Sequence, residues 1–443
     1  MRDRVGAALA LADRETEATL ALDPTSARVR SRFAEVLFNR ALLAESGRQL
    51  VQRDELLARM DLYDLDRSRR ARWNQPGRVE LTSDPPGAAV TLQRYDEDRF
   101  GRMSLQTVEA PPATPWEDLV IPPGSYLAVL STPGRATTRA PFLLARGEFV
   151  QLKIPLLPET DVPPGFVPVP AGRFLVGSAE DDAQRRGFLH AVPLHQVWTG
   201  PFLVARYETT FADWVAWLRF LAPAQRQQRL PAVHTGGFAG ALVFRELAGL
   251  EWELVIKPSS LTWKVRSGEP LDYPGRDRRA IQDWMRFPVT GISAADATAY
   301  AAWLASSGQV PGARLCTEWE WERAARGADG RNWPHGNDLA PDDANFDETY
   351  GKKPEAMGPD EVGSHPASRS PFGIDDAAGN AWEWTVSAID PTAIAARGGS
   401  FYFDRNSAMA AEREIPEPSF RDVSVGFRVC ADPVPIGSLR SSP

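Results

Sequence analysis

The sequence predicts an α+β protein built from three successive parts, and changes in composition along the chain mark their boundaries. Residues 1–75 are rich in alanine, leucine, arginine and glutamate, which favour helices. Residues 76–160 alternate short apolar stretches with proline–glycine turns, a pattern typical of short β-strands. Residues 164–433 combine short helical patterns with many tryptophans, glycines and prolines, which favours a domain held by loops and aromatic packing. Residues 434–443 are predicted to form a flexible tail.

The helical part is interrupted at Asp23-Pro24-Thr25, where a capping residue and a proline restart a helix. Apolar residues from Val29 to Leu42 then recur every three or four positions, which predicts one apolar helix face. A further charged helix is predicted over roughly 49–71. The pattern resembles a tetratricopeptide-type hairpin, but one unit does not make a repeat array. A hairpin and a helical stalk both remain open interpretations.

The second part predicts a small β-sandwich. Residues 78–83 alternate like a strand, Asp84-Pro85-Pro86-Gly87 is a turn, and extended structure follows at 88–92, 121–130 and 149–154. The turn and a second proline–glycine motif resemble the PEGA domain, a small β module often found beside bacterial signalling and surface domains. That resemblance implies a spacing or binding role, and the pattern contains no catalytic constellation.

Composition narrows the classes of partner. The net charge is −8, from 50 basic and 58 acidic residues, which argues against nucleic-acid binding because phosphate contacts need a concentrated basic surface. No apolar run approaches the roughly 18–20 residues of a membrane helix, so we expect no membrane span. The N-terminus lacks the apolar core of a secretory signal, which predicts a cytoplasmic location.

The third part carries a series of short motifs in a fixed order. They are Ala205-Arg206-Tyr207-Glu208, Thr290-Gly291-Ile292-Ser293, Arg314-Leu315-Cys316-Thr317-Glu318-Trp319, Gly379-Asn380-Ala381-Trp382-Glu383-Trp384, Arg397-Gly398-Gly399-Ser400 and Gly426-Phe427-Arg428. Together they resemble the formylglycine-generating enzyme or sulfatase-modifying factor family. The resemblance implies a variant of the C-type-lectin-like fold. The order of the three parts also resembles the C-terminal regions of large bacterial Ser/Thr kinases, although no kinase motif is present.

The stretch between about 223 and 285 is an insertion relative to that family. It contains Trp252, Trp263, Tyr273 and Trp284 among mixed charges. Two interpretations stay open, a local elaboration of the core and a surface for a partner.

The positions of the family's copper site argue against its chemistry. The family enzyme oxidises a substrate cysteine to formylglycine with copper held by two cysteine thiolates, which are soft ligands suited to Cu(I). The resemblance places these thiolates at the third and eighth positions after the serine of Arg-Gly-Gly-Ser. Here those positions hold Phe403 and Ala408, neither of which can bind copper. We therefore expect no copper cofactor.

The chain has only two cysteines, Cys316 and Cys430. They are interpreted as a structural pair, either buried thiols or a disulfide, rather than as a relocated metal or redox site. A reducing cytoplasm would keep them as thiols.

Calcium is the metal that the resemblance favours, because acidic side chains and carbonyls on a tight loop suit a hard cation. A simpler interpretation is that Asn380 and Glu383 only bind loop amides. The ligands that the resemblance implies are Asp376 and Glu383 through their side chains, Gly379 and Ala381 through their carbonyl oxygens, and Asn345 and Phe346 at the start of a second site.

The favoured function is therefore non-catalytic binding or sensing of a peptide or protein partner. Aromatic, charged and amide side chains follow the Arg-Gly-Gly motif, where the family enzyme holds an extended substrate peptide, and they make a recognition surface. The candidate ligand-binding residues are Ser400, Tyr402, Phe403, Asp404, Arg405 and Asn406.

Two alternatives remain. One is a retroelement-diversified variable binding protein of the same fold. The other is a divergent oxidoreductase or peptide-modifying enzyme. Its candidate groups would be Glu412, Arg413, Glu414, Ser400 and Asp404, although no spacing gives them a mechanism. The iron-dependent sulfoxide synthases of this fold use three histidines in a helical domain, and residues 1–75 contain none.

Overall fold

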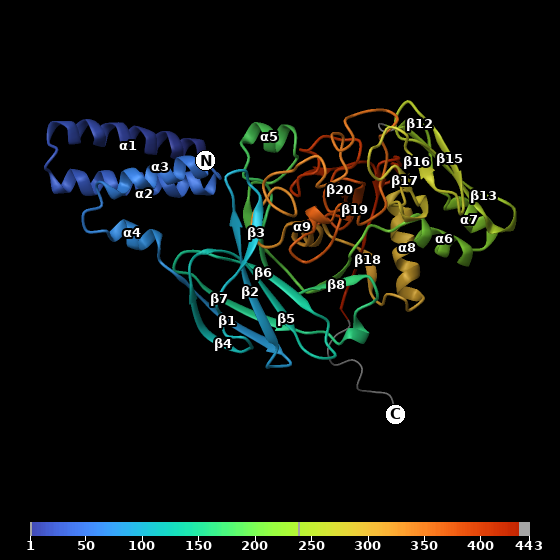
Figure 1. Cartoon of the computed structure of the whole chain (residues 1–443), viewed down its shortest axis with the longest axis horizontal. Helices are drawn as coiled ribbons and strands as arrows, with labels where there is room; N and C mark the ends of the chain where they lie inside the picture. Colours follow the sequence, from blue (N-terminus) through green and yellow to red (C-terminus); the bar gives the residue numbers. More distant parts are fainter. Residues whose placement is uncertain (1, 238–239, 434–443) are drawn as a thin grey trace.

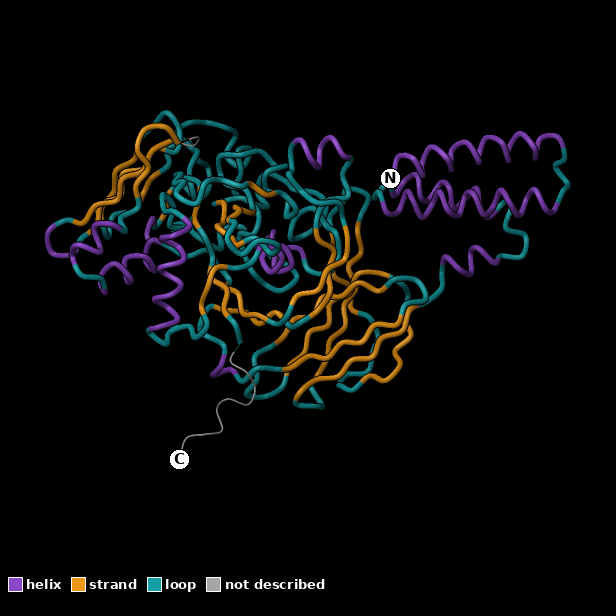
Figure 2. Tube along the Cα trace, turned by 180° about the vertical axis from the view of Figure 1, so that it is seen from behind, coloured by secondary structure: helices purple, strands orange, loops and turns teal. Residues whose placement is uncertain are grey.

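The computed structural model describes residues 2–237 and 240–433. The helices and the sheet of the insertion lie at opposite ends of the long axis, with the β module and the large domain between them (Figures 1 and 2). The predicted tail at 434–443 lies outside the described residues. Across the described part of the chain, no helix is long and apolar enough to cross a membrane.

The N-terminal helices pack side by side around an apolar core that includes Phe33, Leu37 and Met60. They are α1 (Arg2–Leu22), α2 (Ala27–Ser46), α3 (Leu50–Asp61) and α4 (Ser68–Trp73). The predicted single helix over 49–71 is wrong, because the chain turns between α3 and α4. Arg67 has a left-handed φ of 55° there. The Asp64 carboxylate accepts hydrogen bonds from the first amides of α4 and so caps that helix.

Residues 77–155 form two sheets that face each other across a core including Val79, Trp116, Tyr126 and Ile154. One sheet has the order β4-β1-β7, with β1 and β7 parallel, and the other is the antiparallel sheet β3-β2-β5-β6. The predicted strands near 78–83, 88–92, 121–130 and 149–154 are confirmed as β1, β2, β4 with β5, and β7. The strands are β1 (Gly77–Asp84), β2 (Ala89–Glu97), β3 (Met103–Thr107), β4 (Trp116–Ile121), β5 (Gly124–Ser131), β6 (Thr138–Leu144) and β7 (Phe149–Pro155).

Polar contacts fasten both N-terminal parts to the large domain. Arg48, in the turn after α2, donates to the side-chain oxygens of Asn332 and Asn337. From β5, the Ser125 hydroxyl donates to Asp329 at 2.6 Å. The three parts therefore make direct contact through side chains rather than through linkers alone.

The large domain has short elements separated by long ordered loops. Its helices α6, α8 and α9 each begin with a capping box, in which a Ser or Thr hydroxyl and an acidic side chain three residues later satisfy the first amides. Its helices and 3₁₀ turns are η1 (Glu159–Asp161), α5 (Asp182–Gly187), α6 (Phe211–Phe220), α7 (Pro223–Gln228), η2 (Ala248–Leu250), η3 (Trp284–Arg286), α8 (Ala294–Ser306), α9 (Glu318–Arg326) and η4 (Pro366–Ser368).

The sheets of this domain have the orders β18-β23-β11-β8, β21-β20-β19-β22, β12-β13-β14-β15, β10-β9 and β16-β17. The strands are β8 (Phe166–Val169), β9 (Gly172–Val176), β10 (His195–Thr199), β11 (Phe202–Ala205), β12 (Ala232–Gly237), β13 (Gly240–Glu246), β14 (Trp252–Lys257), β15 (Trp263–Arg266), β16 (Leu271–Asp272), β17 (Ile281–Gln282), β18 (Ala313–Leu315), β19 (Trp382–Val386), β20 (Ile394–Arg397), β21 (Arg413–Glu414), β22 (Val425–Gly426) and β23 (Val429–Ala431).

Part of the insertion packs into the core. Its residues Trp252, Tyr273 and Trp284 are fully buried and belong to the same apolar cluster as Trp214 and Trp384. The open question about its role is thereby answered for these aromatic side chains, which pack inward instead of presenting a surface to a partner.

Cys316 and Cys430 form a disulfide between the end of β18 and β23. Disulfides persist mainly in oxidising compartments. The predicted cytoplasmic location stays a prediction.

Candidate functional site

A buried ion pair between Glu383 and Arg428 lies at the centre of the large domain. The Arg428 guanidinium donates to both carboxylate oxygens of Glu383, at 2.6 and 2.7 Å, and both side chains are fully buried. The indole Nε1 of Trp321 donates to the same carboxylate at 2.7 Å. The remaining guanidinium protons go to the backbone carbonyls of residues 205, 206 and 375. The pair therefore ties together β19, α9, the end of β11 and the residue that precedes β23, and we call the Glu383–Arg428 pair with Trp321 and the surrounding backbone the hub.

The Arg-Gly-Gly-Ser motif forms a second buried network. Arg397 donates to Glu322 and to the carbonyl of Ala410, and the opposite oxygen of Glu322 accepts from Arg326. Gly399 has a φ of 73°, and a Cβ there would lie 2.8 Å from the Cα of Ala408. Only glycine allows the following loop to fold back this closely.

The two positions of the family's copper ligands are filled by apolar contacts. The ring of Phe403 packs edge-on against Trp382, with centroids 5.9 Å apart. Ala408 is buried in a cluster with Leu189 and Trp333. Both cysteines of the chain are in the disulfide, so no free thiolate is available to this loop.

The predicted recognition residues divide into two groups. Ser400 is 1% exposed, which weighs against direct contact with a partner, and its assignment as a ligand-binding residue stays a prediction. Residues 402–406 are all partly exposed. Two of them are also engaged within the loop, since Asp404 accepts from the amides of Asn406 and Ser407 and Arg405 donates to the carbonyl of Leu339.

The candidate calcium residues lie in the same buried region, but they differ in whether their oxygen atoms are free to bind a cation. Glu383 is already bound by Arg428 and Trp321 on both oxygens. Asp376 is 3% exposed and accepts from the amide of Gly363. Gly379 and Ala381 lie in the loop that leads into β19.

Glu208, which sequence reasoning did not assign to the site, supplies a second available carboxylate. It is 2% exposed, one of its oxygens accepts from Asn380 at 3.3 Å, and the other has no partner. Burial, followed by the charge of Asp376, raises the pKa of Glu208 well above its ordinary value. Burial likewise raises the pKa of Asp376 to about 6. This excess of buried acid fits a hard cation near Asp376 and Glu208, but not at Glu383.

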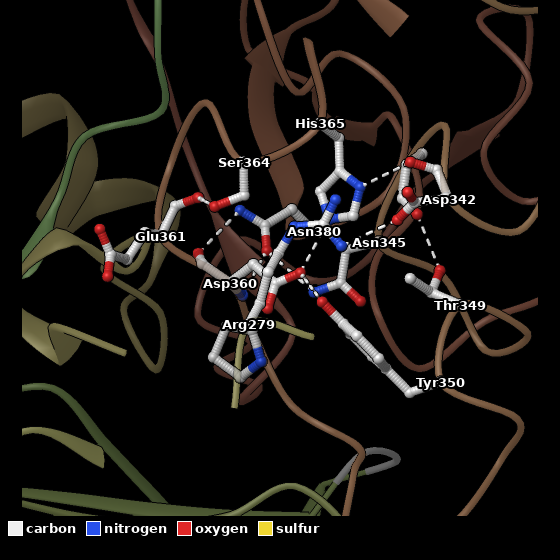
Figure 3. A network of polar contacts seen from close by, with 12 residues as sticks. Arg279, Asp342, Asn345, Thr349, Tyr350, Asp360, Glu361, Ser364, His365 and Asn380 are labelled. Atoms are coloured by element: carbon white, nitrogen blue, oxygen red, sulfur yellow. Dashed lines mark hydrogen bonds and ion pairs between the residues drawn. The ribbon is translucent and has the colours of Figure 1, made fainter. Parts of the chain in front are cut away.

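A network around Asp360 holds the loop that precedes the hub (Figure 3). Asp360 is fully buried and accepts from Arg276, from Tyr350 at 2.7 Å and from His365 at 2.7 Å. The second ring nitrogen of His365 lies 3.0 Å from the carbonyl of Asp342. Both partners of this histidine are acceptors, an arrangement that favours the ring protonated on both nitrogens, which is the imidazolium.

The pKa values follow the same arrangement. Burial lowers the pKa of His365, but the hydrogen bond and charge of Asp360 outweigh it and raise the pKa above its ordinary value. Burial raises the pKa of Asp360, and the charge of Arg276 with the His365 hydrogen bond reverses that effect and lowers the pKa overall. Arg276 also stacks between two tyrosine rings, with Tyr350 at 3.9 Å.

Asn345 and Phe346, the predicted start of a second calcium site, lie beside this network. The side-chain amide of Asn345 donates to the backbone carbonyl of Gly358 at 3.0 Å. The backbone carbonyl of Asn345 accepts from the backbone amide of Asn380 at 2.7 Å. Asn345 therefore links the network to the central loop (Figure 3), and Phe346 is buried in the apolar cluster with Ala408.

A groove of about 670 Å³ opens next to Glu208. Its volume is within the usual range for ligand-binding clefts. None of the predicted recognition residues 402–406 lines this groove. The lining includes Phe166, Tyr207, Glu208, Asp213, Arg286 and Tyr300.

Comparison with known proteins identifies the large domain. The profile of the sulfatase-modifying factor enzyme 1-like domain matches residues 155–433. The chain belongs to this family.

The chain is similar to several named proteins over this domain. A formylglycine-generating enzyme of Thermomonospora curvata is 29% identical over 314 residues, which cover 63% of this chain and 98% of that protein. The mouse protein called inactive C-alpha-formylglycine-generating enzyme 2 is 30% identical over 242 residues, covering 52% of this chain and 70% of its own. Among solved structures, PvdO from Pseudomonas aeruginosa aligns over 60% of this chain and 94% of its own, at 23% identity and a TM-score of 0.44.

Proposed function

We propose that this chain is a non-catalytic binding member of the sulfatase-modifying factor family and that it recognises a peptide or protein partner. The observation that carries the proposal is that Phe403 and Ala408, at the positions where the resemblance places the copper thiolates, cannot bind copper. The hub keeps its buried Glu383–Arg428 pair, and the loop keeps its turn at Gly399. Relatives described as inactive support the view that this domain serves functions other than formylglycine synthesis.

The partly exposed segment 402–406 is the proposed contact surface. Tyr402 and Phe403 stack edge to face with centroids 5.4 Å apart, so their ring orientations are fixed before a partner arrives. Rigid aromatic side chains give contact area at a low entropic cost and are enriched at interaction hot spots.

An oxygen-uptake assay tests the absence of copper chemistry. Wild-type protein supplied with Cu(I) and a cysteine-containing peptide should consume no more oxygen than a protein-free blank. Formation of an aldehyde product by the wild-type chain, lost on substitution of a loop residue, would overturn the proposal.

A gain-of-function variant sharpens that assay. Phe403→Cys/Ala408→Cys restores two thiolates at the positions implied by the family and should bind one Cu(I) ion. The matched control Tyr402→Cys/Ser407→Cys has the same number of thiols at neighbouring positions and should bind copper more weakly. Equal copper affinity in the two variants would show that the loop no longer has the geometry of the site.

Partner binding is tested with an immobilised peptide library and tag-free full-length protein. Tyr402→Ala and Phe403→Ala should each weaken binding of any selected peptide by about tenfold or more, the effect expected at a hot spot. Ile415→Ala is the control, because Ile415 is an exposed apolar residue outside the segment. Peptides that bind all three variants equally well would place recognition elsewhere.

We also propose a structural Ca²⁺ near Asp376. Its side chain, the carboxyl group of Glu208 and nearby loop carbonyls such as that of Gly379 would hold the ion, which would offset the excess of buried acid. Removing the ion with a chelator should lower the melting temperature, and Asp376→Asn should abolish that chelator effect. An unchanged melting temperature in excess chelator would count against the site.

A further inference from the structure

A cluster of His190, Glu412 and Glu414 lies outside the hub and outside the residues assigned to calcium. One ligand atom from each of the three side chains lies within 4.8 Å of the other two. The histidine follows α5, whereas the two glutamates flank Arg413 at the start of β21, more than 200 positions later in the chain. The fold therefore brings together groups that sequence spacing does not relate.

Backbone pairing explains how the cluster forms. The amide of Arg413 donates to the carbonyl of Leu189 at 3.3 Å. Residues 412 and 414 are two apart along an extended segment, so their side chains project on the same side. The side chain of Arg413 instead donates to both oxygens of Glu318, at 2.8 and 2.9 Å. The intervening positive charge is thereby already paired with another acid.

The buried member of the cluster points to a ligand. Glu412 is 2% exposed, and its Oε2 has no hydrogen-bond partner. An unpartnered buried carboxylate oxygen is costly, since it gives up hydration without gaining a donor. A second carboxylate from Glu414 beside it adds repulsion that a cation would relieve.

The hydrogen bond of His190 leaves one ring nitrogen available to bind a metal ion. Its Nδ1 lies 3.3 Å from the carbonyl of Arg413, an acceptor, so that nitrogen carries the proton. The other ring nitrogen, Nε2, then has a free lone pair. Metal-bound histidines commonly donate their second ring nitrogen to a backbone carbonyl in this way, which fixes the tautomer and the ring orientation.

We propose that His190, Glu412 and Glu414 bind one first-row divalent cation, with Zn²⁺ as the best-fitting representative. One imidazole nitrogen and two carboxylate oxygens are ligands that Zn²⁺ accepts. An ion equidistant from three atoms that are up to 4.8 Å apart would lie at most about 2.8 Å from each, so side-chain movements of less than about 1 Å reach the bond lengths of about 2.0–2.2 Å.

Such an ion would join two segments next to the altered loop. Leu189 packs in the same apolar cluster as Ala408 and Ala411, so the metal would hold the segment after α5 against the polypeptide that follows position 408. Three protein ligands leave a fourth position for water or for a donor atom from a bound molecule. The site therefore adds a metal-dependent clamp beside the proposed contact surface.

The test is a calorimetric titration of tag-free full-length protein with Zn²⁺, in buffer containing excess Ca²⁺. Wild-type protein should bind one Zn²⁺ ion. His190→Gln and Glu414→Gln, both at exposed positions, should each weaken binding by about tenfold or more while leaving the circular dichroism spectrum unchanged.

Matched controls separate this site from incidental surface binding. His195 is also exposed and also lies beside a backbone carbonyl, that of Pro193 at 2.7 Å, but it is not part of an acidic cluster. His195→Gln and Glu417→Gln should leave the affinity for Zn²⁺ unchanged. Absence of saturable Zn²⁺ binding by the wild type, or full binding by the His190→Gln/Glu414→Gln double variant, would overturn the proposal.

Thermal unfolding gives a second readout. Zn²⁺ should raise the melting temperature of the wild type and of His195→Gln, because a ligand that binds only the folded state stabilises it. The melting temperature of His190→Gln should not respond. A response of equal size in both histidine variants would also contradict the site.

Discussion

The clusters around Asp360 and Glu412 both place a buried carboxylate beside a histidine, yet they differ in how that carboxylate is satisfied. Asp360 accepts from Arg276, His365 and Tyr350, so donors and charge surround it. Glu412 has an oxygen without a partner and a second acid beside it. The satisfied Asp360 fits a structural role, whereas the unsatisfied oxygen of Glu412 leaves a position for a ligand such as the proposed cation.

The largest expected effect comes from breaking the satisfied cluster. Asp360→Asn removes the charge that balances Arg276 and His365, and should lower the free energy of unfolding by about 3–5 kcal/mol. Urea denaturation monitored by tryptophan fluorescence measures the change. A loss below about 1 kcal/mol would mean that the cluster does not hold this loop, and the contrast with Glu412 would fail.

The pH dependence of stability tests the imidazolium. Because the pKa of His365 is raised by folding, the folded state binds more protons than the unfolded chain above the ordinary value of about 6.5. Its stabilising contribution is complete below that pH and is lost as the pH rises through the higher folded pKa. Unfolding free energies measured from about pH 6 upward should fall in the wild type, and His365→Gln should flatten that part of the curve. A parallel fall in both proteins would assign the effect to another group.

The unsatisfied cluster should tolerate replacement of its buried acid, because burial raises the pKa of Glu412 to about 9 and keeps the metal-free side chain uncharged at neutral pH. Glu412→Gln in metal-free buffer should change the free energy of unfolding by less than about 1 kcal/mol, because its Oε2 has no donor to lose. The same urea experiment compares it directly with Asp360→Asn. A destabilisation as large as that of the aspartate variant would show that Glu412 is structural.

An exposed ion pair provides the baseline. Arg286 and Glu361 lie 2.9 Å apart, but the arginine side chain is 54% exposed, so solvent screens the interaction. Arg286→Met should cost less than about 1 kcal/mol. A larger loss would indicate that even exposed ion pairs in these loops are strongly stabilising. The loss measured for Asp360→Asn could then no longer be attributed to burial of its charge.

Sequence reasoning identified the parts of this fold that are built from local patterns. The strands at 78–83 and 149–154 could be predicted from their alternation, and the helix break at Asp23-Pro24 from its capping residues. The division of residues 49–71 into two helices could not, because it depends on a left-handed Arg67 and on capping by Asp64. Both are choices of backbone geometry that composition does not reveal.

The candidate sites could not be predicted in full either, because they depend on contacts between residues that are far apart in the sequence. Motif resemblance located Asp376 and Glu383, but the pairing of Glu383 with Arg428 joins residues 45 positions apart. The sequence marks Glu412 and Glu414 as candidate groups without a mechanism, and it gives His190 no role. These three residues come together because the segment around Leu189 pairs with the segment around Arg413. The only sign of this site in the sequence is the alternation Glu412-Arg413-Glu414, which places two acids on one side of an extended segment.

The disulfide between Cys316 and Cys430 closes a covalent ring that contains both the hub and the altered loop. Ile389 lies within that ring and is 80% exposed, next to a turn at Asp390. Protease cleavage there would leave the two pieces linked through the sulfur atoms, and they would separate only in reductant. A single cut at this turn would therefore leave the hub covalently connected under oxidising conditions. Only reduction of the disulfide would turn the cut into a separation of two polypeptides.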